Sequence, residues 1–312
     1  MSRDEIQRFL VECFPGEEIN FAGCGTDSMA FKVGGNICRF PHKSVDVYAA
    51  EAAVVDAVRH GVSVPIPRID IVSVGGHEFA VHKMITGGKW SWHKYSWAPR
   101  RQRNLARSYA QFLGELHALD TGTLVRRVPT LSDTVPYCDW GEISQWLGRF
   151  MTPGQMRCFA RNYRRIVNAP VDADDMVFVH MGMKGANSVV DQEGNICGVF
   201  DFCNGGIYER WRDFVLPYLG RNGRLFRSIL REYYSRTGRR PNSGRIADLA
   251  AIEFLWRRRL YVNGVFAPRS DHFIKKNLAV ALARFHRLPK PLYWLIYARM
   301  SMYQKKRRGI NA

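Results

Sequence analysis

The sequence predicts an α+β protein of two lobes, in which a small antiparallel sheet with one helix precedes a larger and mainly helical lobe. Short strand-like runs occur in pairs around glycine-containing turns in residues 1–86, whereas residues 87–312 carry helical periodicity over most of their length. Strands and helices are therefore segregated along the chain, and do not alternate as in a parallel βαβ sheet. We place the lobe boundary at residues 86–88, where Thr-Gly-Gly interrupts the strand pattern.

Two hairpins and one helix are expected in the first lobe. The runs SMAFKV and NICRF flank residues 34–36, and the runs IDIVSV and HEFAVHKMI flank residues 75–76, so each pair indicates a hairpin. Residues 44–60 are rich in alanine and repeat apolar side chains at helical spacing, and Gly61 ends the pattern.

The second lobe is expected to begin with a helix over residues 104–120, which we take as its spine. Its apolar residues recur at steps of three and four, namely Leu105, Tyr109, Phe112, Leu113 and Leu116. Further helices are predicted over residues 142–150, 152–167, 212–220, 224–238 and 245–264, followed by a basic tail at residues 285–312.

The net charge of +18 is concentrated in the last third of the sequence. Residues 221–312 contain 22 Lys and Arg but four acidic residues, which leaves 24 of each sign, out of totals of 46 and 28, in residues 1–220. A region of one sign attracts anions through its field, so the pattern favours an anionic substrate or surface. Residues 291–308, PLYWLIYARMSMYQKKRR, have the composition of an interfacial membrane helix, and a packing helix with a solvated basic end is the alternative.

Cysteine usage and hydropathy indicate a cytoplasmic protein, with peripheral contact at the inner face of a membrane as a variant of that expectation. The seven cysteines include no Cys-x-x-Cys pair, and an odd number cannot all pair within one chain. The first 19 residues lack an apolar core behind a basic start, unlike a signal peptide. No stretch approaches the roughly 18 apolar residues that a membrane span needs.

The strongest chemical signal is VFVHMGMKGANSVVDQEGNICGVFDF at residues 177–202, where Asn187 follows His180 by seven residues and Asp201 lies fourteen beyond. An amide oxygen and a carboxylate are hard ligands for Mg²⁺, and the intervening VVDQEGNICGVF predicts a hairpin that returns the chain to the metal. His180 follows the apolar run MVFV, so we expect it to be buried and to hold the loop by hydrogen bonds. A turn aspartate is the alternative for Asp201.

Other residues fit phosphate binding. Gly23, Gly25 and Ser28 lie in a strand-turn-strand setting, where backbone N–H groups can approach phosphate oxygens, although ordinary hairpin glycines are commoner. Arg39 on the next strand could reach the α- and β-phosphates, with Glu51 on the following helix orienting it. Taken singly, both are more often surface charges.

In order and spacing these features resemble the aminoglycoside and choline phosphotransferase family, whose members have a protein-kinase-like fold. The resemblance runs from about residue 18 to residue 220, and it also includes VPIPRI, FAVHKMITG, FLGELHALD and Asp213. It implies a nucleotide-binding first lobe, in which ATP would be bound by the phosphate-binding residues above and by Lys83, Met84 and Ile85. It further implies Mg²⁺ on Asn187 and Asp201.

One part of the family pattern is missing. The family's His-Gly-Asp with four residues to Asn appears here as His180-Met181-Gly182 with four residues to Asn187. The resemblance therefore implies that Gly182 stands where a general base would receive the acceptor's proton. General-base assistance typically raises a rate by about 10²- to 10⁴-fold, whereas phosphoryl transfer relies mainly on positioning and electrostatics. We therefore expect slow turnover and not a complete loss of activity.

The sequence thus predicts an ATP-dependent phosphotransferase that transfers the γ-phosphate to a hydroxyl of an anionic small molecule or glycan. The basic last third would repel polycationic aminoglycosides, which disfavours an antibiotic acceptor. The alternative is a pseudokinase, a nucleotide-binding interaction module that retains Asn187 and Asp201 without the base. A nucleic-acid-binding protein is a third hypothesis that rests on C-terminal charge alone, and no specific nucleic acid is expected as a partner.

Overall fold

The computed structural model describes residues 1–25, 28–42, 44–92, 98–130, 140–148, 151–220, 222–262 and 298 of the 312. The chain forms two compact units. The first contains Met1–Thr130, Met176–Asp213 and Gly220–Arg240, and the second contains Leu131–Asp175, Phe214–Leu219 and Pro241–Ala312. The lobe boundary at residues 86–88 divides the chain by element type and stays a prediction.

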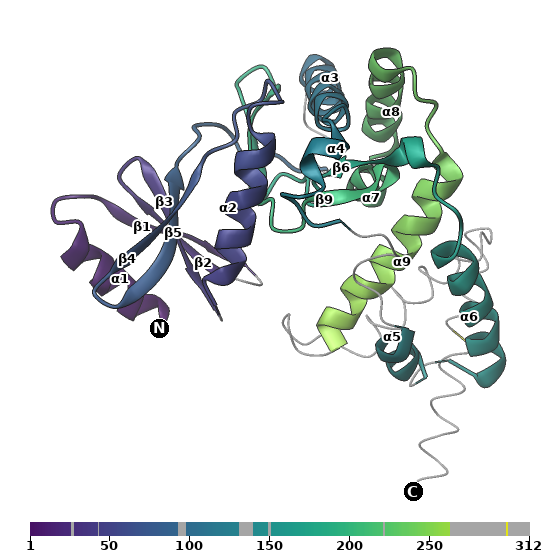
Figure 1. The fold of residues 1–312 in the computed structure, drawn as a ribbon, viewed down its shortest axis with the longest axis horizontal. Helices are drawn as coiled ribbons and strands as arrows, with labels where there is room; N and C mark the ends of the chain where they lie inside the picture. The colour runs from purple at the N-terminus through teal and green to yellow at the C-terminus, as the bar shows by residue number, and fades with distance from the viewer. Residues whose placement is uncertain are drawn as a thin grey trace, which may run out of the picture. The chain divides into compact units, whose positions relative to one another are not determined.

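The first unit begins with a five-stranded antiparallel sheet of order β1-β2-β3-β5-β4 (Figure 1). Its strands are β1 (Ile19–Cys24), β2 (Ser28–Val33), β3 (Asn36–Pro41), β4 (Ile69–Val74) and β5 (His77–Lys83). Val33 faces Asn36, and Val74 faces His77, so both predicted hairpins form. Gly34, at φ 53°, supplies the left-handed conformation that the first of these turns needs.

Two helices accompany this sheet, where the sequence analysis expected one. The predicted helix over residues 44–60 is α2 (Asp46–Val58), which packs against β4. The unexpected helix is α1 (Arg3–Cys13), which begins with a capping box between Ser2 and Glu5. It buries Ile6 and Leu10 in the apolar core of the sheet, and Phe9 packs against the same core.

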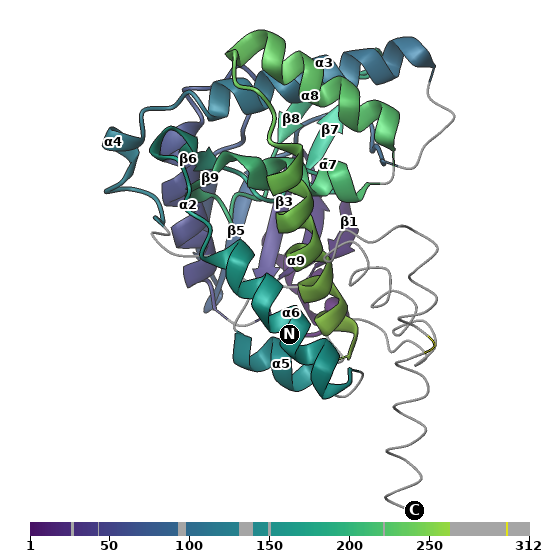
Figure 2. The same cartoon turned by 90° about the vertical axis from the view of Figure 1, so that its right-hand side faces the viewer.

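The helical part of the first unit contains α3 (Pro99–Leu116) and α8 (Gly223–Thr237), which lie side by side (Figures 1 and 2). α3 buries all five apolar residues of the predicted stripe. It begins five residues before the predicted start, because Pro99 suits a first helical turn. The short α4 (Thr121–Leu124) follows α3.

Two small two-stranded antiparallel sheets complete the first unit. β6 (Met176–Val179) pairs with β9 (Gly206–Glu209), and β7 (Ser188–Val190) pairs with β8 (Ile196–Val199). The second pair is the hairpin predicted between Asn187 and Asp201. The 3₁₀ turns η1 (Ala173–Asp175) and η2 (Arg210–Phe214) lie before β6 and after β9.

The second unit is helical in its described part, with α5 (Trp140–Leu147), α6 (Pro153–Val167), α7 (Val215–Leu219) and α9 (Ser243–Val262). α9 packs against the other three, and Arg165 of α6 contacts Asp248 of α9 at 3.4 Å. No helix in the described ranges has both the length and the apolar character to cross a bilayer. The basic tail predicted at residues 285–312 lies outside the described residues, apart from residue 298.

Candidate functional site

Strand β3 and helix α2 bring Arg39 and Glu51 together in a buried ion pair. Arg39 Nη1 donates to Glu51 Oε2 at 2.8 Å, and the two side chains are 14% and 0% exposed. Burial raises the pKa of Glu51, and the facing guanidinium opposes that shift. The guanidinium also lies 4.7 Å from the centre of the Tyr48 ring. The two residues are therefore not the solvated surface charges of the alternative interpretation.

Glu51 also holds the segment that contains Asp201. Its second oxygen, Oε1, accepts a hydrogen bond from the backbone N–H of Phe202 at 2.9 Å. Arg39, Glu51 and Asp201 line one cavity with six other residues, namely Val55, Ile66, Pro67, Ile69, His82 and Phe200. The Glu51 carboxylate thus holds both the Arg39 guanidinium and the backbone next to Asp201.

Asp201 has an unusual backbone conformation. Its φ of 70° lies in the left-handed region, which costs about 1–3 kcal/mol for a residue other than glycine and persists only where the surroundings impose it. The Glu51 bond to Phe202 supplies such a constraint. The Cys203 thiol donates to Asp201 Oδ1 at 2.9 Å, and burial together with the Asp201 carboxylate raises the pKa of this thiol, which keeps it protonated.

Asn187 presents an oxygen because its amide nitrogen is occupied. Nδ2 donates to the carbonyl of Gly182 at 3.0 Å, so Oδ1 is the atom left to act as a ligand. The backbone carbonyl of Asn187 accepts from Phe200 N–H at 3.0 Å as the β7–β8 hairpin returns. Asp201 therefore follows directly after the residue that pairs with Asn187.

His180 is fully buried and holds the loop through both ring nitrogens. Nδ1 accepts from Gly182 N–H at 3.0 Å, and Nε2 donates to the Phe200 carbonyl at 3.2 Å. A backbone N–H can only donate and a carbonyl can only accept, so these partners require the neutral tautomer with its proton on Nε2. Burial lowers the pKa of His180 and favours the same neutral form.

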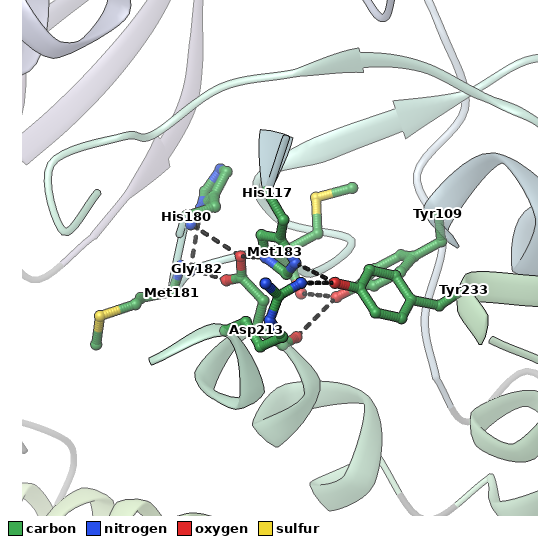
Figure 3. Close-up of polar contacts among 9 residues, drawn as sticks. Tyr109, His117, His180, Met181, Gly182, Met183, Asp213 and Tyr233 are labelled. Atoms are coloured by element: carbon green, nitrogen blue, oxygen red, sulfur yellow. Dashed lines mark hydrogen bonds and ion pairs between the residues drawn. The ribbon is translucent and has the colours of Figure 1, made fainter. Parts of the chain in front are cut away.

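Asp213 anchors the start of this loop (Figure 3). Its carboxylate accepts from His180 N–H at 3.0 Å and from Met181 N–H at 2.6 Å, and it contacts His117 Nε2 at 3.1 Å. Met181 has φ 60°, the second positive value for a residue other than glycine in the described part of the chain. The buried carboxylate therefore fixes a turn that the loop sequence alone would disfavour.

Side chains from distant helices support Asp213. The Tyr233 hydroxyl on α8 lies 2.8 Å from His117 Nδ1 and accepts from Arg210 Nη1 at 2.8 Å. The Tyr109 hydroxyl on α3 contacts the carbonyls of Met183 and Asp213 at 3.3 and 3.4 Å. Figure 3 shows His117 between the Asp213 carboxylate and the Tyr233 hydroxyl. Sequence reasoning did not find this network, because its members are scattered along the chain.

The other predicted nucleotide residues lie apart from this network. Gly23 is the second-last residue of β1, and in the turn that follows Gly25 N–H donates to the Ser28 carbonyl at 2.8 Å. Residues 26 and 27 of this turn lie outside the described ranges. In the pairing of β2 with β3, Ser28 lies opposite Pro41 and Ala30 lies opposite Arg39. The turn is therefore two strand positions away from Arg39.

Lys83, Met84 and Ile85 follow the sheet at the end of β5. Met84 N–H donates to the Gly35 carbonyl at 2.9 Å, and the Ile85 side chain covers Gly198 of β8. In the described ranges, no hydrogen bond or ion pair joins these three residues, or Gly23, Gly25 and Ser28, to Arg39, Asn187 or Asp201. Their roles stay predictions.

We predict that Asp213→Asn destabilises the protein by about 1–3 kcal/mol, because the new amide turns one acceptor into a donor that faces backbone N–H groups. Urea unfolding measures the change. Asp56→Asn, at an exposed position on α2, is the matched control and should stay within about 0.5 kcal/mol. Equal effects of the two variants would contradict the anchoring role.

The buried histidines predict a loss of stability in mild acid. Burial lowers the folded-state pKa of both His180 and His82, whereas histidine in an unfolded chain titrates near about 6.5. As the pH falls below about 6.5 the unfolded state binds more protons, so the free energy of unfolding decreases. Urea unfolding at a series of pH values measures this slope, which should be shallower in His180→Phe. An unchanged slope in that variant would show that His180 does not contribute.

Comparison with known proteins identifies the family. The sequence matches the profile of the phosphotransferase enzyme family over residues 23–249, and a search of curated proteins finds no match. The fold is similar to a complex of APH(2")-IIia with GDP and kanamycin, with TM-score 0.68, 15% identity and coverage of 91% of this chain and 99% of that one. It is also similar to a ternary complex of APH(2")-IIa with streptomycin and ATP, with TM-score 0.63, 15% identity and coverage of 91% and 99%.

A third similar structure is the apoenzyme of macrolide 2'-phosphotransferase MphH from Brachybacterium faecium, with TM-score 0.60, 16% identity and coverage of 92% of this chain and 99% of that one. At these identities the solved structures establish the fold, and the profile match over residues 23–249 of the 312 establishes the family. The protein therefore has a protein-kinase-like α+β fold and belongs to the phosphotransferase enzyme family.

Proposed function

We propose that this protein transfers the γ-phosphate of ATP to a hydroxyl group of a small molecule. The Glu51 carboxylate carries the proposal, because it joins the Arg39 guanidinium to the backbone that follows Asp201. A cation and a carboxylate that are held side by side are what phosphates with a bound metal require. Similar structures contain ATP in one case and GDP in another, so the choice of ATP is part of the proposal.

The donor atoms present fit Mg²⁺. Asp201 supplies a carboxylate and Asn187 supplies Oδ1, and both are hard oxygen donors. In the described part of the chain no group of three or more His, Cys, Asp or Glu side chains could hold a metal. That is consistent with Mg²⁺, which keeps several waters and takes further oxygens from substrate phosphates. When bound, the metal would neutralise charge on those phosphates.

Within this proposal, Arg39 binds the phosphates and His180 keeps the loop in place for Asn187. The acceptor hydroxyl would attack the γ-phosphorus, form the new O–P bond and release ADP. Gly182 cannot take the hydroxyl proton, so that proton would pass to solvent. Turnover would then be slower by about the 10²- to 10⁴-fold that a general base typically provides.

We further propose an anionic acceptor, such as a phosphorylated or carboxylated sugar or a glycan. The basic residues of positions 221–312 support it, and four exposed arginines on α8 belong to them, namely Arg224, Arg227, Arg231 and Arg236. Kanamycin and streptomycin, which occur in complexes of the similar structures, are polycations that such a field would repel. Peripheral contact with an anionic membrane through the basic tail remains part of this proposal.

Nucleotide binding is the first expected outcome. ATP with Mg²⁺ at about 100 times its Kd should stabilise the protein by about 2.7 kcal/mol, measured by thermal unfolding. Asp201→Asn should lose the part of this stabilisation that depends on Mg²⁺, whereas Asp56→Asn should retain it. Absence of any shift with ATP or GTP would refute the proposed enzyme.

The second candidate function is a nucleotide-binding module without turnover, and Gly182 is the observation that favours it. A Cβ at this position would lie 3.1 Å from Asn187 Nδ2 and 3.2 Å from His180 Nδ1, so a side chain fits only with small shifts of its neighbours. Gly182→Ala therefore controls for the crowding that Gly182→Asp also causes.

We predict that Gly182→Asp hydrolyses ATP at least about 10²-fold faster than Gly182→Ala, measured as ADP release with Mg²⁺ and water as the acceptor. A slow but measurable rate in the parent would support the enzyme. A parent that binds ATP without turnover, together with an active Gly182→Asp, would support the binding module. Equal rates in the two variants would show that an aspartate at position 182 does not act as the general base.

A further inference from the structure

The exposed sides of α3 and α8 carry six arginines, which we call the arginine face. The two helices are neighbours, and together they contain eight Arg, two Glu and no Lys or Asp (Figures 1 and 2). On each helix three exposed arginines follow one another at steps of three and four residues, so each set lies on one side of its helix. The six are Arg100, Arg103 and Arg107 on α3, and Arg224, Arg227 and Arg231 on α8.

Five of these guanidinium groups form no ion pair with any described residue. The sixth, Arg100, contacts Glu193 at 3.0 Å, and this pair contributes little because its side chains are 74% and 58% exposed. The two glutamates of the helices do not compensate the charge. Glu115 already accepts hydrogen bonds from other residues, and Glu232 follows Arg231 directly, so those two side chains point about 100° apart around α8.

The arginine face has the chemistry and the extent to meet an anionic surface. A guanidinium group presents a planar fork of N–H donors that matches the oxygens of a phosphate group. Each set of three arginines extends about 10 Å along its helix, and packed helices lie about 8–10 Å apart. The positive charge therefore covers an area and is not a single line, which makes it complementary to a plane of negative charge.

Aromatic side chains distinguish a membrane from a nucleic acid as the partner. Proteins that bind single-stranded nucleic acid stack successive bases on several aromatic rings. Within α3 and α8, which are described in full, Tyr234 is the one exposed aromatic residue, at 51%. A tyrosine beside arginines is typical of a bilayer interface, where the ring lies at the level of the headgroups. Residues 291–308 add a second segment with interfacial composition.

We infer that the arginine face docks on an anionic phospholipid bilayer, where its guanidinium groups bind headgroup phosphates. Clusters of about four to eight Lys and Arg are a known recognition element for such lipids. The inference goes beyond the proposed function and does not depend on it, because it uses neither Arg39 nor Asp201. The proposed anionic acceptor draws on the field of the α8 arginines, whereas here these side chains contact lipid directly.

Cosedimentation of the full chain with phosphatidylcholine vesicles, with and without phosphatidylserine and in the absence of nucleotide, tests the inference. Binding should require phosphatidylserine and weaken as salt is added, because salt screens the attraction. Each arginine near an anionic bilayer contributes about fivefold to affinity. The triple variant Arg224→Gln, Arg227→Gln and Arg231→Gln should therefore bind on the order of 100-fold more weakly. Glutamine is a good helix former, so α8 should persist.

The matched control replaces three exposed arginines of α6 by Gln, namely Arg157, Arg161 and Arg164. It removes the same charge at the same kind of spacing and should bind vesicles like the parent. The basic tail is present in every protein compared, so it does not affect the difference. A second triple variant, with Gln at the three arginines of the α3 set, should lose binding as the α8 variant does, and it guards against misfolding of the latter.

Absence of vesicle binding by the parent, or equal losses in the α6 and α8 variants, would overturn the inference. Tighter binding to a single-stranded RNA oligonucleotide than to vesicles at equal phosphate concentration, lost in the same α8 variant, would overturn it in favour of a nucleic acid. The α8 variant should keep the parent's stabilisation by ATP with Mg²⁺. Loss of nucleotide binding in all of these proteins would count against the proposed function alone.

Discussion

The buried carboxylate of Asp213 is the interaction on which the rest of the candidate site depends. A charge removed from water is costly unless hydrogen bonds compensate it, and this one meets two backbone N–H groups and the His117 ring. Those N–H groups belong to His180 and Met181, at the point where the chain leaves β6. Once this point is fixed, the His180 ring can reach both Gly182 and Phe200.

A second buried carboxylate does the same for the other half of the site. Glu51 binds Phe202 N–H with one oxygen and Arg39 with the other. Met181 and Asp201 are the residues other than glycine with positive φ in the described part of the chain, and each lies at an N–H group held by a buried carboxylate. The protein thus combines local backbone strain with two buried charges, which is the pattern expected of a functional site.

Much of this could be predicted from the sequence. Paired strand runs around glycine turns gave both hairpins, and helical periodicity gave α2, α3 and the later helices in the ranges that the structure describes. Arg39 and Glu51 are unremarkable singly, but their order in a series of spaced motifs indicated the pair that the structure contains. The β7–β8 hairpin followed from the turn-forming DQEGN sequence between two apolar runs.

The rest depends on contacts between residues far apart in the sequence. His117 and Tyr233 meet across 116 positions, and no local pattern encodes that contact. Sequence reasoning missed α1, although Ile6, Phe9 and Leu10 have the spacing of one helix face and all three pack against the core of the sheet. His82 directly follows the apolar run FAV, and its environment depends on the hydrogen bond to Lys83 and on the neighbouring Arg39.

A crystal structure of the protein with Mg²⁺ and a non-hydrolysable ATP analogue would test the proposed site most directly. We expect the metal on Asn187 Oδ1 and the Asp201 carboxylate, with Arg39 contacting the phosphates. A nucleotide bound elsewhere, or phosphates and metal that touch none of these three residues, would contradict the proposed function and leave a kinase-like fold with a different use.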